Sequence, residues 1–124
     1  MWIRCNPNPL GKQTGDCVVR AIAIATGRSW RNVYRDLCEV GEIECELPNS
    51  NYIWGTYLKD MGAEQFLLPE ACPKCITVRA FSEKYPEGTY VIGTGSHAVA
   101  VMEGNYYDSW DSGNEVPTYF WRIR

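Results

Sequence analysis

The chain has 124 residues, of which 45% are hydrophobic and 22% charged, with 12 Lys and Arg against 15 Asp and Glu. This composition excludes an intrinsically disordered chain and is that of one globular domain, for which we expect the bounds 1–124. The net charge of −3, without a long basic run, argues against a nucleic-acid partner bound through its phosphate backbone.

The sequence also argues against a membrane partner. Its longest apolar stretch, which ends at Ala25, is far shorter than the roughly 20 residues that a membrane-spanning helix needs. Residues 1–13 lack the basic segment and apolar run of a secretory signal. We therefore expect a cytoplasmic protein whose six cysteines are reduced.

The first predicted elements are an extended segment and a buried helix. Residues 1–15 are rich in Pro, Asn and Gly, which predicts a turning, extended segment. Residues 16–26 predict a helix with Asp16 or Thr14 as its N-cap. Only Arg20 is polar inside this apolar run, and a helix that is apolar on nearly all sides is expected to be buried.

Two more helices are predicted in the first half of the chain. The second runs from Ser29, which is its N-cap, to about residue 40, and Gly41 ends it. The third is capped by Asn49 or Ser50 and has an apolar face.

The second half changes to strand-forming sequence, rich in Val, Ile, Tyr and Trp. A short helix is expected over residues 77–85. The predicted strands are residues 64–68, 89–93, 97–102, 106–110 and 118–123. Helices first and antiparallel strands after them indicate an α+β fold.

Cys17 is a candidate nucleophile because of its place in the predicted buried helix. It lies at or next to the first turn, where free backbone N–H groups and the helix dipole stabilise a thiolate. The preceding Thr-Gly-Asp sequence would keep the backbone open there. The alternative interpretation is a small buried residue that fills space at a helix start.

His97 and Asp108 are candidates for a base and the group that orients it. His97 is the one histidine of the chain and follows a glycine-containing segment at a strand start, although an ordinary hydrogen-bonded or surface histidine is the alternative. A two-residue turn at 103–104 or 104–105 would place Asp108 on the same sheet face, diagonal to His97. A wider or bulged turn would bring them closer. Otherwise Asp108 is a solvated aspartate at a strand end.

The three residues together predict acyl-transfer chemistry. Cys17 would attack a carbonyl, His97 would take its proton and later protonate the leaving group, and Asp108 would hold the ring and its tautomer. Backbone N–H groups at the helix start, with a nearby amide side chain, would hold the oxyanion. This chemistry requires no cofactor.

At these residues the sequence resembles a known superfamily. GDCVVRAI resembles the nucleophile helix of papain-like cysteine peptidases and is especially similar to the DGNC(L)FRAI pattern of ovarian-tumour-type deubiquitinases. SHAVAVMEG with YYDSW is similar to papain's second half, where His-Ala-Val opens one strand and Asn-Ser-Trp closes the next. The chain also resembles, nearly end to end, small uncharacterised papain-like proteins of bacteriophages and prophages of gut bacteria. The resemblance implies a papain-like fold with Cys17, His97 and Asp108 as its triad.

Two features depart from the papain-like pattern. Papain-like enzymes usually place an oxyanion-donating Gln six residues before the Cys, whereas Gln13 lies four before Cys17; Asn6, Asn8 or backbone N–H groups are rivals. Asp108 stands where papain has Asn, as several branches of the superfamily allow. A chain of 124 residues leaves little room for a second lobe, so we expect a shallow cleft and a small or extended substrate, such as a peptide tail.

Trp110 is a candidate supporting residue. It falls on the same predicted face as His97, where it would shield the His–Asp pair from water. Ordinary packing within the hairpin is an equal alternative.

The remaining cysteines give a rival site. Cys72 and Cys75 form a CxxC motif, which Cys38 and Cys45 would complete to a four-thiolate zinc site. The wider spacing of Cys38 and Cys45 argues against that site, and a redox motif is disfavoured because no strand and helix flank it as in thioredoxin-like proteins. We favour a turn with two free thiols, one of them buried, and no metal.

These features predict a cysteine peptidase or related thiol hydrolase that acts on a peptide or isopeptide bond of a peptide or protein substrate. Deamidation, transglutamination or amide hydrolysis of a small molecule would use the same thioester. A phage-encoded module that binds a host factor without catalysis is the alternative from another class. The sequence makes no prediction of the oligomeric state.

Overall fold

The computed structural model describes all 124 residues and has the predicted mixture of helices and strands. The helices are α1 (Cys17–Thr26), α2 (Trp30–Glu44), α3 (Asn51–Asp60) and α4 (Val78–Lys84). The strands are β1 (Trp2–Arg4), β2 (Glu64–Leu67), β3 (Thr89–Gly93), β4 (Ala98–Met102), β5 (Asn105–Asp108) and β6 (Tyr119–Arg122). The α+β class, with a helical first half and a mostly antiparallel sheet formed largely by the second half, is thereby confirmed.

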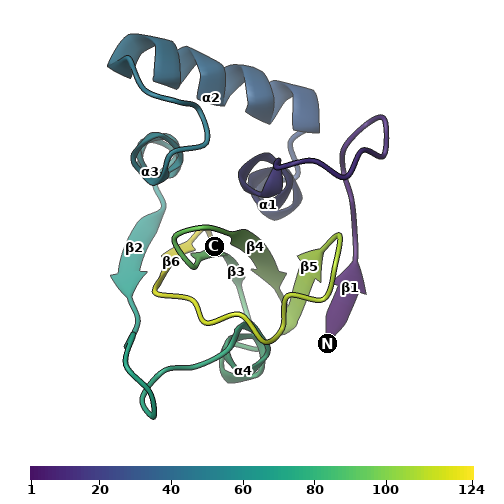
Figure 1. Ribbon diagram of the computed structural model, residues 1–124, viewed down its shortest axis with the longest axis vertical. Coiled ribbons are helices and arrows are strands. Elements are labelled where there is room, and N and C mark those ends of the chain that lie inside the picture. The colour runs from purple at the N-terminus through teal and green to yellow at the C-terminus, as the bar shows by residue number, and fades with distance from the viewer.

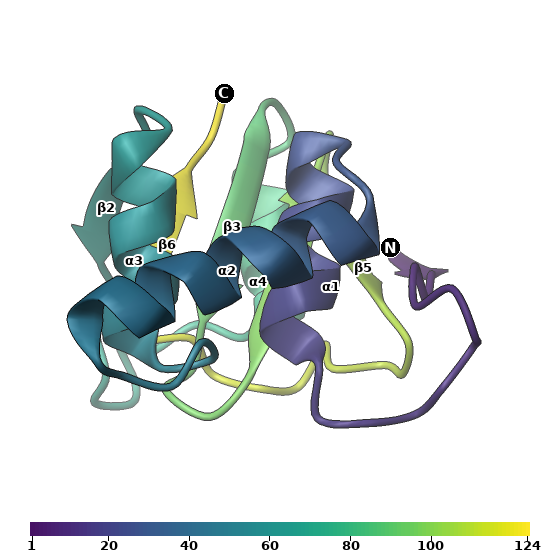
Figure 2. The same ribbon diagram turned by 90° about the horizontal axis from the view of Figure 1, so that it is seen from above.

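The strands form one sheet between two helical layers (Figure 1). The strand order is β1-β5-β4-β3-β6-β2, and every pairing is antiparallel except that of β1 with β5. Helices α1, α2 and α3 lie on one side of the sheet, and α4 lies on the other. Figure 2 shows α2 crossing over α1 and α3 as the outermost layer.

The central strands are buried on both faces because each face has its own hydrophobic core. On β4, Ala98 and Ala100 belong to the core under α1, whereas Val99 and Val101 belong to the core under α4. Small alanine side chains on the α1 side let the helix approach the sheet closely. Because α1 is itself apolar on most sides, it is enclosed between β4 and the outer helices, as predicted.

One helix boundary has the expected position without the expected capping bond, and another differs from the expectation. Asp16 is the N-cap residue of α1, but its side chain makes no capping hydrogen bond, because buried side-chain donors occupy both carboxylate oxygens. Gly41 does not end α2, which continues to Glu44 and ends at Cys45 in a left-handed conformation. Gly41 is buried, and a Cβ there would lie 2.6 Å from the Glu46 carbonyl oxygen. The close approach of the Glu46 carbonyl oxygen therefore explains why position 41 is a glycine.

The β4–β5 hairpin has the first of the two predicted turns. Met102 pairs with Asn105, which leaves Glu103 and Gly104 as the turn residues. Both have positive φ, 49° and 81°, as a type I′ turn requires. The turn fixes the register of the hairpin and therefore the relative positions of the residues at its open end.

Strand β1 lies in the segment that was predicted to be irregular. It pairs in parallel with β5, so that Trp2 is opposite Tyr106 and Arg4 is opposite Asp108. A three-residue strand with this pairing depends on a partner more than 100 residues away, and local sequence patterns carry no such signal.

The four cysteines of the rival zinc site do not come together. Cys38 lies on α2 and Cys45 at its end, whereas Cys72 and Cys75 lie in the loop between β2 and α4 and are joined by a disulfide. The expectation of free thiols at Cys72 and Cys75 is therefore wrong for this structure. No helix is of the length and apolarity that crossing a membrane requires.

Candidate active site

Cys17, His97 and Asp108 meet at one end of the sheet, where β4 begins and β5 stops. Cys17 is the first residue of α1, His97 immediately precedes β4, and Asp108 is the last residue of β5. Because β4 and β5 are antiparallel, the start of one and the end of the other lie at the same edge. The structure thus brings together three residues that are far apart in the sequence, and their catalytic role stays a prediction.

The Cys17 thiol lies within hydrogen-bonding reach of the His97 side chain and of the Ala98 backbone N–H. Burial alone would raise its pKa. The two hydrogen bonds and the positive charges of His97 and Arg20 outweigh burial and lower the pKa of Cys17 below the ordinary thiol value. The environment therefore favours the thiolate, which is the nucleophilic form.

His97 is held between Cys17 and Asp108. Its Nε2 lies 2.6 Å from Asp108 Oδ2, which leaves Nδ1 as the ring nitrogen available to Cys17. Burial alone would lower the pKa of His97, but the hydrogen bonds and charges of Asp108 and Cys17 raise it to about 9. At neutral pH the ring is accordingly an imidazolium, and its charge favours the thiolate form of Cys17.

The backbone around His97 is fixed by a tight turn. Thr94 Oγ1 accepts a hydrogen bond from the His97 N–H at 3.0 Å, and the Thr94 N–H donates to the His97 carbonyl oxygen at 2.9 Å. Only 10% of the His97 side chain is exposed. The ring therefore has a defined position without being sealed from the solvent.

Asp108 is almost completely buried, with 3% of its surface exposed. Its carboxylate accepts hydrogen bonds from Ser112 Oγ at 2.7 Å and from the Ser109 N–H at 2.8 Å, in addition to the His97 contact. Burial would raise the pKa of Asp108, but the His97, Ser112 and Ser109 hydrogen bonds and the His97 charge outweigh it and lower the pKa. Asp108 therefore stays ionised and can stabilise the imidazolium.

Strand β1 contributes to the position of Asp108. Trp2 Nε1 donates to the Asp108 carbonyl oxygen at 3.1 Å, and the Cys5 N–H donates to the same oxygen at 3.0 Å. These two hydrogen bonds from the N-terminal segment hold the end of β5 in place at the site.

Arg20 is the main residue of this site that the sequence analysis did not assign. It is 5% exposed and bridges Asp16 and Asp108, with its Nη2 3.2 Å from Asp108 Oδ1. Asp16 also accepts hydrogen bonds from Trp30 Nε1 at 2.9 Å and Asn8 Nδ2 at 3.2 Å. The available signal was that Arg20 is the one charged residue inside an apolar, buried helix.

A cavity of about 290 Å³ opens beside Cys17 and His97. The side chains of Asn49 and Asn51 also border it, but Asn51 already binds Trp54, Tyr119 and the Gly95 carbonyl oxygen. Asn49 and the backbone N–H groups at the start of α1 are the donors beside the cavity for which an oxyanion role can be proposed. The sequence analysis did not single out Asn49 for this role.

The amide side chains that were expected near the oxyanion lie elsewhere. Gln13 is exposed and does not line the cavity, since the chain turns between Thr14 and Asp16 before α1 begins. Asn6 donates to the Lys12 carbonyl oxygen and Asn8 to Asp16. The expectation for Gln13 is therefore not supported by its position.

Trp110 contacts His97, as the hairpin register implies. The two ring centroids are 4.9 Å apart at an interplanar angle of 42°. Trp110 is 45% exposed, so its ring covers one side of the imidazole while its other side faces solvent. It is placed to limit the access of water to the His97–Asp108 pair.

No protein-family model, curated protein or solved structure matches this chain.

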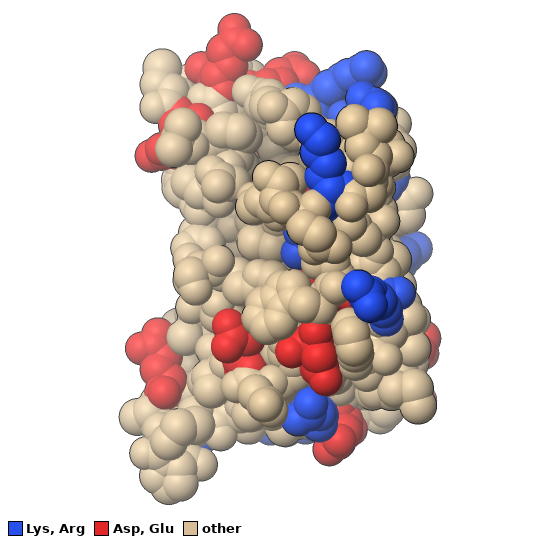
Figure 3. Space-filling view, turned by 45° about the vertical axis from the view of Figure 1, so that its right-hand side comes forward, with Lys and Arg blue, Asp and Glu red and all other residues tan.

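The distribution of charged side chains on the surface bears on the kind of partner. On the face shown in Figure 3, basic and acidic side chains are interspersed with uncharged surface and form no continuous basic stripe.

Proposed function

We propose that the protein is a thiol hydrolase with a papain-like arrangement that cleaves a peptide or isopeptide bond in a peptide or protein substrate. The observation that carries this proposal is the continuous chain of contacts from the Cys17 thiol through the His97 ring to the buried Asp108 carboxylate. These are the three positions of nucleophile, base and orienting group in cysteine hydrolases.

Acylation begins with attack of the Cys17 thiolate on the scissile carbonyl carbon. The oxyanion that forms is held by N–H groups at the start of α1, where the helix dipole is positive, and by the Asn49 amide. His97 then donates its Nδ1 proton to the amine nitrogen as the C–N bond breaks. The amine leaves, and the acyl group remains on Cys17 as a thioester.

Deacylation reverses these roles. Neutral His97 removes a proton from water, whose oxygen attacks the thioester carbonyl. The C–S bond breaks, the Cys17 thiolate is restored beside the imidazolium, and the product is a carboxylic acid. Asp108 keeps the ring oriented and stabilises its positive charge in both half-reactions.

The proposal is tested with a library of peptides derived from a digested proteome. Wild-type protein and Cys17→Ala are each incubated with the library, and new termini are identified by mass spectrometry. We expect cleavage by the wild type only. Circular dichroism and thermal unfolding of Cys17→Ala provide the control that the variant is folded.

The same experiment distinguishes the related acyl transfers. Fragments of a library peptide indicate hydrolysis of its backbone, whereas an intact peptide in which an amide NH₂ has been replaced by OH indicates deamidation. Cleavage that persists at wild-type level in Cys17→Ala would overturn the proposed mechanism. A folded wild type that changes no peptide would favour a binding module on this scaffold.

A further inference from the structure

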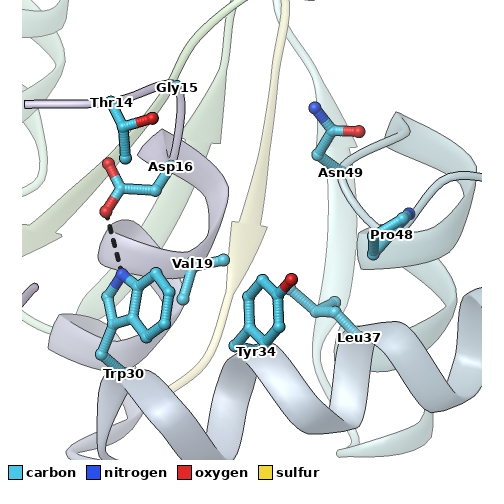
Figure 4. A pocket seen from close by; sticks show the side chains of 9 residues that line it. All are labelled: Thr14, Gly15, Asp16, Val19, Trp30, Tyr34, Leu37, Pro48 and Asn49. Carbon is cyan, nitrogen blue, oxygen red and sulfur yellow. Dashed lines mark hydrogen bonds between the residues drawn. The ribbon is translucent and has the colours of Figure 1, made fainter.

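One face of helix α2 is left uncovered by the rest of the chain. Figure 2 shows α2 as the outermost layer, and Figure 4 shows Trp30 and Tyr34 pointing from α2 toward α1. The buried residues of the helix are Val33, Leu37 and Gly41. Because an α-helix has about 3.6 residues per turn, the residues on the opposite side from these three point to the solvent.

Four charged residues follow the outer side of α2 and form a row that we name the charge stripe: Arg31, Arg35, Glu39 and Glu42. Their spacings of four, four and three residues keep them on one side of the helix. All four are exposed, and none forms an ion pair within the chain. The stripe is therefore free to contact another molecule.

The charges of the stripe are separated by sign along the helix. Both arginines lie in the first half of α2, and both glutamates lie in the second half. At the top of Figure 3, where α2 lies, acidic side chains gather toward its C-terminal end and basic side chains toward its N-terminal end. The uncovered face thus carries a positive and a negative half of equal charge.

This order of charges does not stabilise α2 itself. The helix dipole favours acidic residues in the first turn and basic residues in the last, and α2 has neither. Arg35 also precedes Glu39, which is the less favourable order for an ion pair four residues apart on one helix. Stabilisation of its own helix therefore does not account for the charge stripe.

The stripe is complementary to a second copy of itself in the opposite direction. The outer charges, at positions 31 and 42, are centred between residues 36 and 37, and the inner charges, at positions 35 and 39, are centred on residue 37. One twofold axis at this level therefore sets Arg31 opposite Glu42 of the second copy and also Arg35 opposite Glu39 of the second copy. Each contact occurs twice by symmetry, which gives four ion pairs.

An apolar side chain lies next to the stripe at its acidic end. Ile43 is 73% exposed, although it is a large hydrophobic residue. In the antiparallel arrangement it lies opposite position 31, where the aliphatic part of the Arg31 side chain of the second copy can cover it. Two such contacts add apolar burial to the four ion pairs.

We propose that two copies of this protein associate through their α2 helices, packed antiparallel about a twofold axis level with Leu37, with the charge stripe as the contact. Ion pairs between exposed side chains contribute modestly and are screened by salt, so the dimer is weak and sensitive to salt. The stripe does not line the cavity at Cys17, which stays open in the dimer. The inference is thus independent of the proposed function.

Sedimentation equilibrium of the full chain, from micromolar to millimolar concentration, measures the dissociation constant of the dimer. We expect a monomer–dimer equilibrium at low salt. The dissociation constant is expected to rise about tenfold or more between about 0.01 M and about 1 M salt, because the screening length falls from about 30 Å to about 3 Å.

Two double variants give the stripe a single sign. Arg31→Glu with Arg35→Glu makes it acidic, and Glu39→Arg with Glu42→Arg makes it basic. Each variant alone is expected to stay monomeric, because repulsions replace all four ion pairs. An equimolar mixture of the two is expected to form a heterodimer about as stable as the wild-type dimer, since every contact again joins opposite charges.

A control variant separates the stripe from net charge. Lys84→Glu with Arg122→Glu changes the charge of the protein as much as the acidic variant does, but at exposed positions of α4 and β6. It is expected to dimerise like the wild type. Circular dichroism and thermal unfolding show that each variant is folded.

Three results would overturn the proposal. The wild type could stay monomeric at low salt, the mixture of folded variants could stay monomeric, or both single-sign variants could still dimerise, which would place the contact on another surface. Each of these results leaves the cleavage of peptides by Cys17 untouched, so failure of the dimer is distinguishable from failure of the thiol hydrolase.

Discussion

Arg20 on α1 and Asp108 on β5 form a buried ion pair that ties the helix bearing Cys17 to the strand that orients His97. The same guanidinium holds Asp16 immediately before the helix. Arg20 touches neither Cys17 nor His97 in any hydrogen bond of the structure, yet its charge favours the Cys17 thiolate. We regard Arg20 as a positioning residue, because its buried ion pairs hold α1 and the β4–β5 hairpin in a fixed relative position.

Replacing Arg20 is expected to destabilise the fold. In Arg20→Met, Asp16 and Asp108 keep their burial but lose the guanidinium that bridges them, and breaking a buried ion pair typically costs about 3–5 kcal/mol. Urea unfolding measures the free energy of unfolding. The matched control is Arg28→Met, whose partly exposed pair with Asp36 is expected to contribute about 1 kcal/mol or less. Equal small losses in both variants would contradict the account of Arg20.

Asp108→Asn is expected to lower the pKa of His97 from about 9 toward the ordinary histidine value. The variant keeps an oxygen near Nε2 but removes the negative charge that stabilises the imidazolium. NMR titration gives this pKa directly, because His97 is the one histidine of the chain. An unchanged pKa would mean that Asp108 does not act on the ring.

Turnover is expected to depend on pH in a bell shape. The acid limb appears where the Cys17 thiol ionises, at a pH below the ordinary thiol pKa, because the folded protein lowers that pKa. The alkaline limb appears near pH about 9, where His97 loses the proton that it must donate to the leaving group. The measurement is kcat/KM for a cleaved peptide against pH. A profile that keeps rising above pH 9 would contradict the role of His97 as the acid.

Trp110→Ala is expected to reduce turnover more than stability. The ring is 45% exposed, so its removal is expected to cost about 1–3 kcal/mol of folding free energy, less than the loss of a fully buried tryptophan. Loss of the contact with His97 leaves the imidazole open to water on one side and less restricted. Kinetics and thermal unfolding are compared with Trp110→Phe, which retains an aromatic ring. If turnover and folding stability fall in proportion, the ring only contributes ordinary packing to the hairpin.

Gly41→Ala is expected to destabilise the protein although alanine is the better helix former. The added Cβ would lie 2.6 Å from the Glu46 carbonyl oxygen, so the chain after α2 must shift. Overpacking of this kind typically costs about 1–3 kcal/mol. Thermal unfolding measures the loss, and an increase in the melting temperature would contradict the close approach.

Sequence patterns located the three central residues because each is marked by a local signal. The apolar helix placed Cys17 at a helix start, and the parity of a two-residue turn placed His97 and Asp108 on one face. The structure adds the 2.6 Å contact between His97 Nε2 and Asp108 Oδ2, which their predicted diagonal positions did not establish.

The features that the sequence did not reveal depend on distant partners. The three residues of β1 form a strand only because β5 lies beside them. Likewise, the partners of Arg20 are known only once the hairpin is placed against α1. The Cys72–Cys75 disulfide was missed because the expectation came from the cellular compartment and not from the loop geometry.

The most direct test of the central claim is the pH dependence of alkylation at each cysteine, measured by mass spectrometry in the wild type and in His97→Ala. The account predicts that wild-type Cys17 reacts fast well below pH 8.5, the ordinary thiol pKa, and that His97→Ala loses this advantage. Cys5, Cys38 and Cys45 provide internal controls in the same protein. A Cys17 that reacts no faster than these thiols, or that keeps its reactivity without His97, would contradict the thiolate–imidazolium pair.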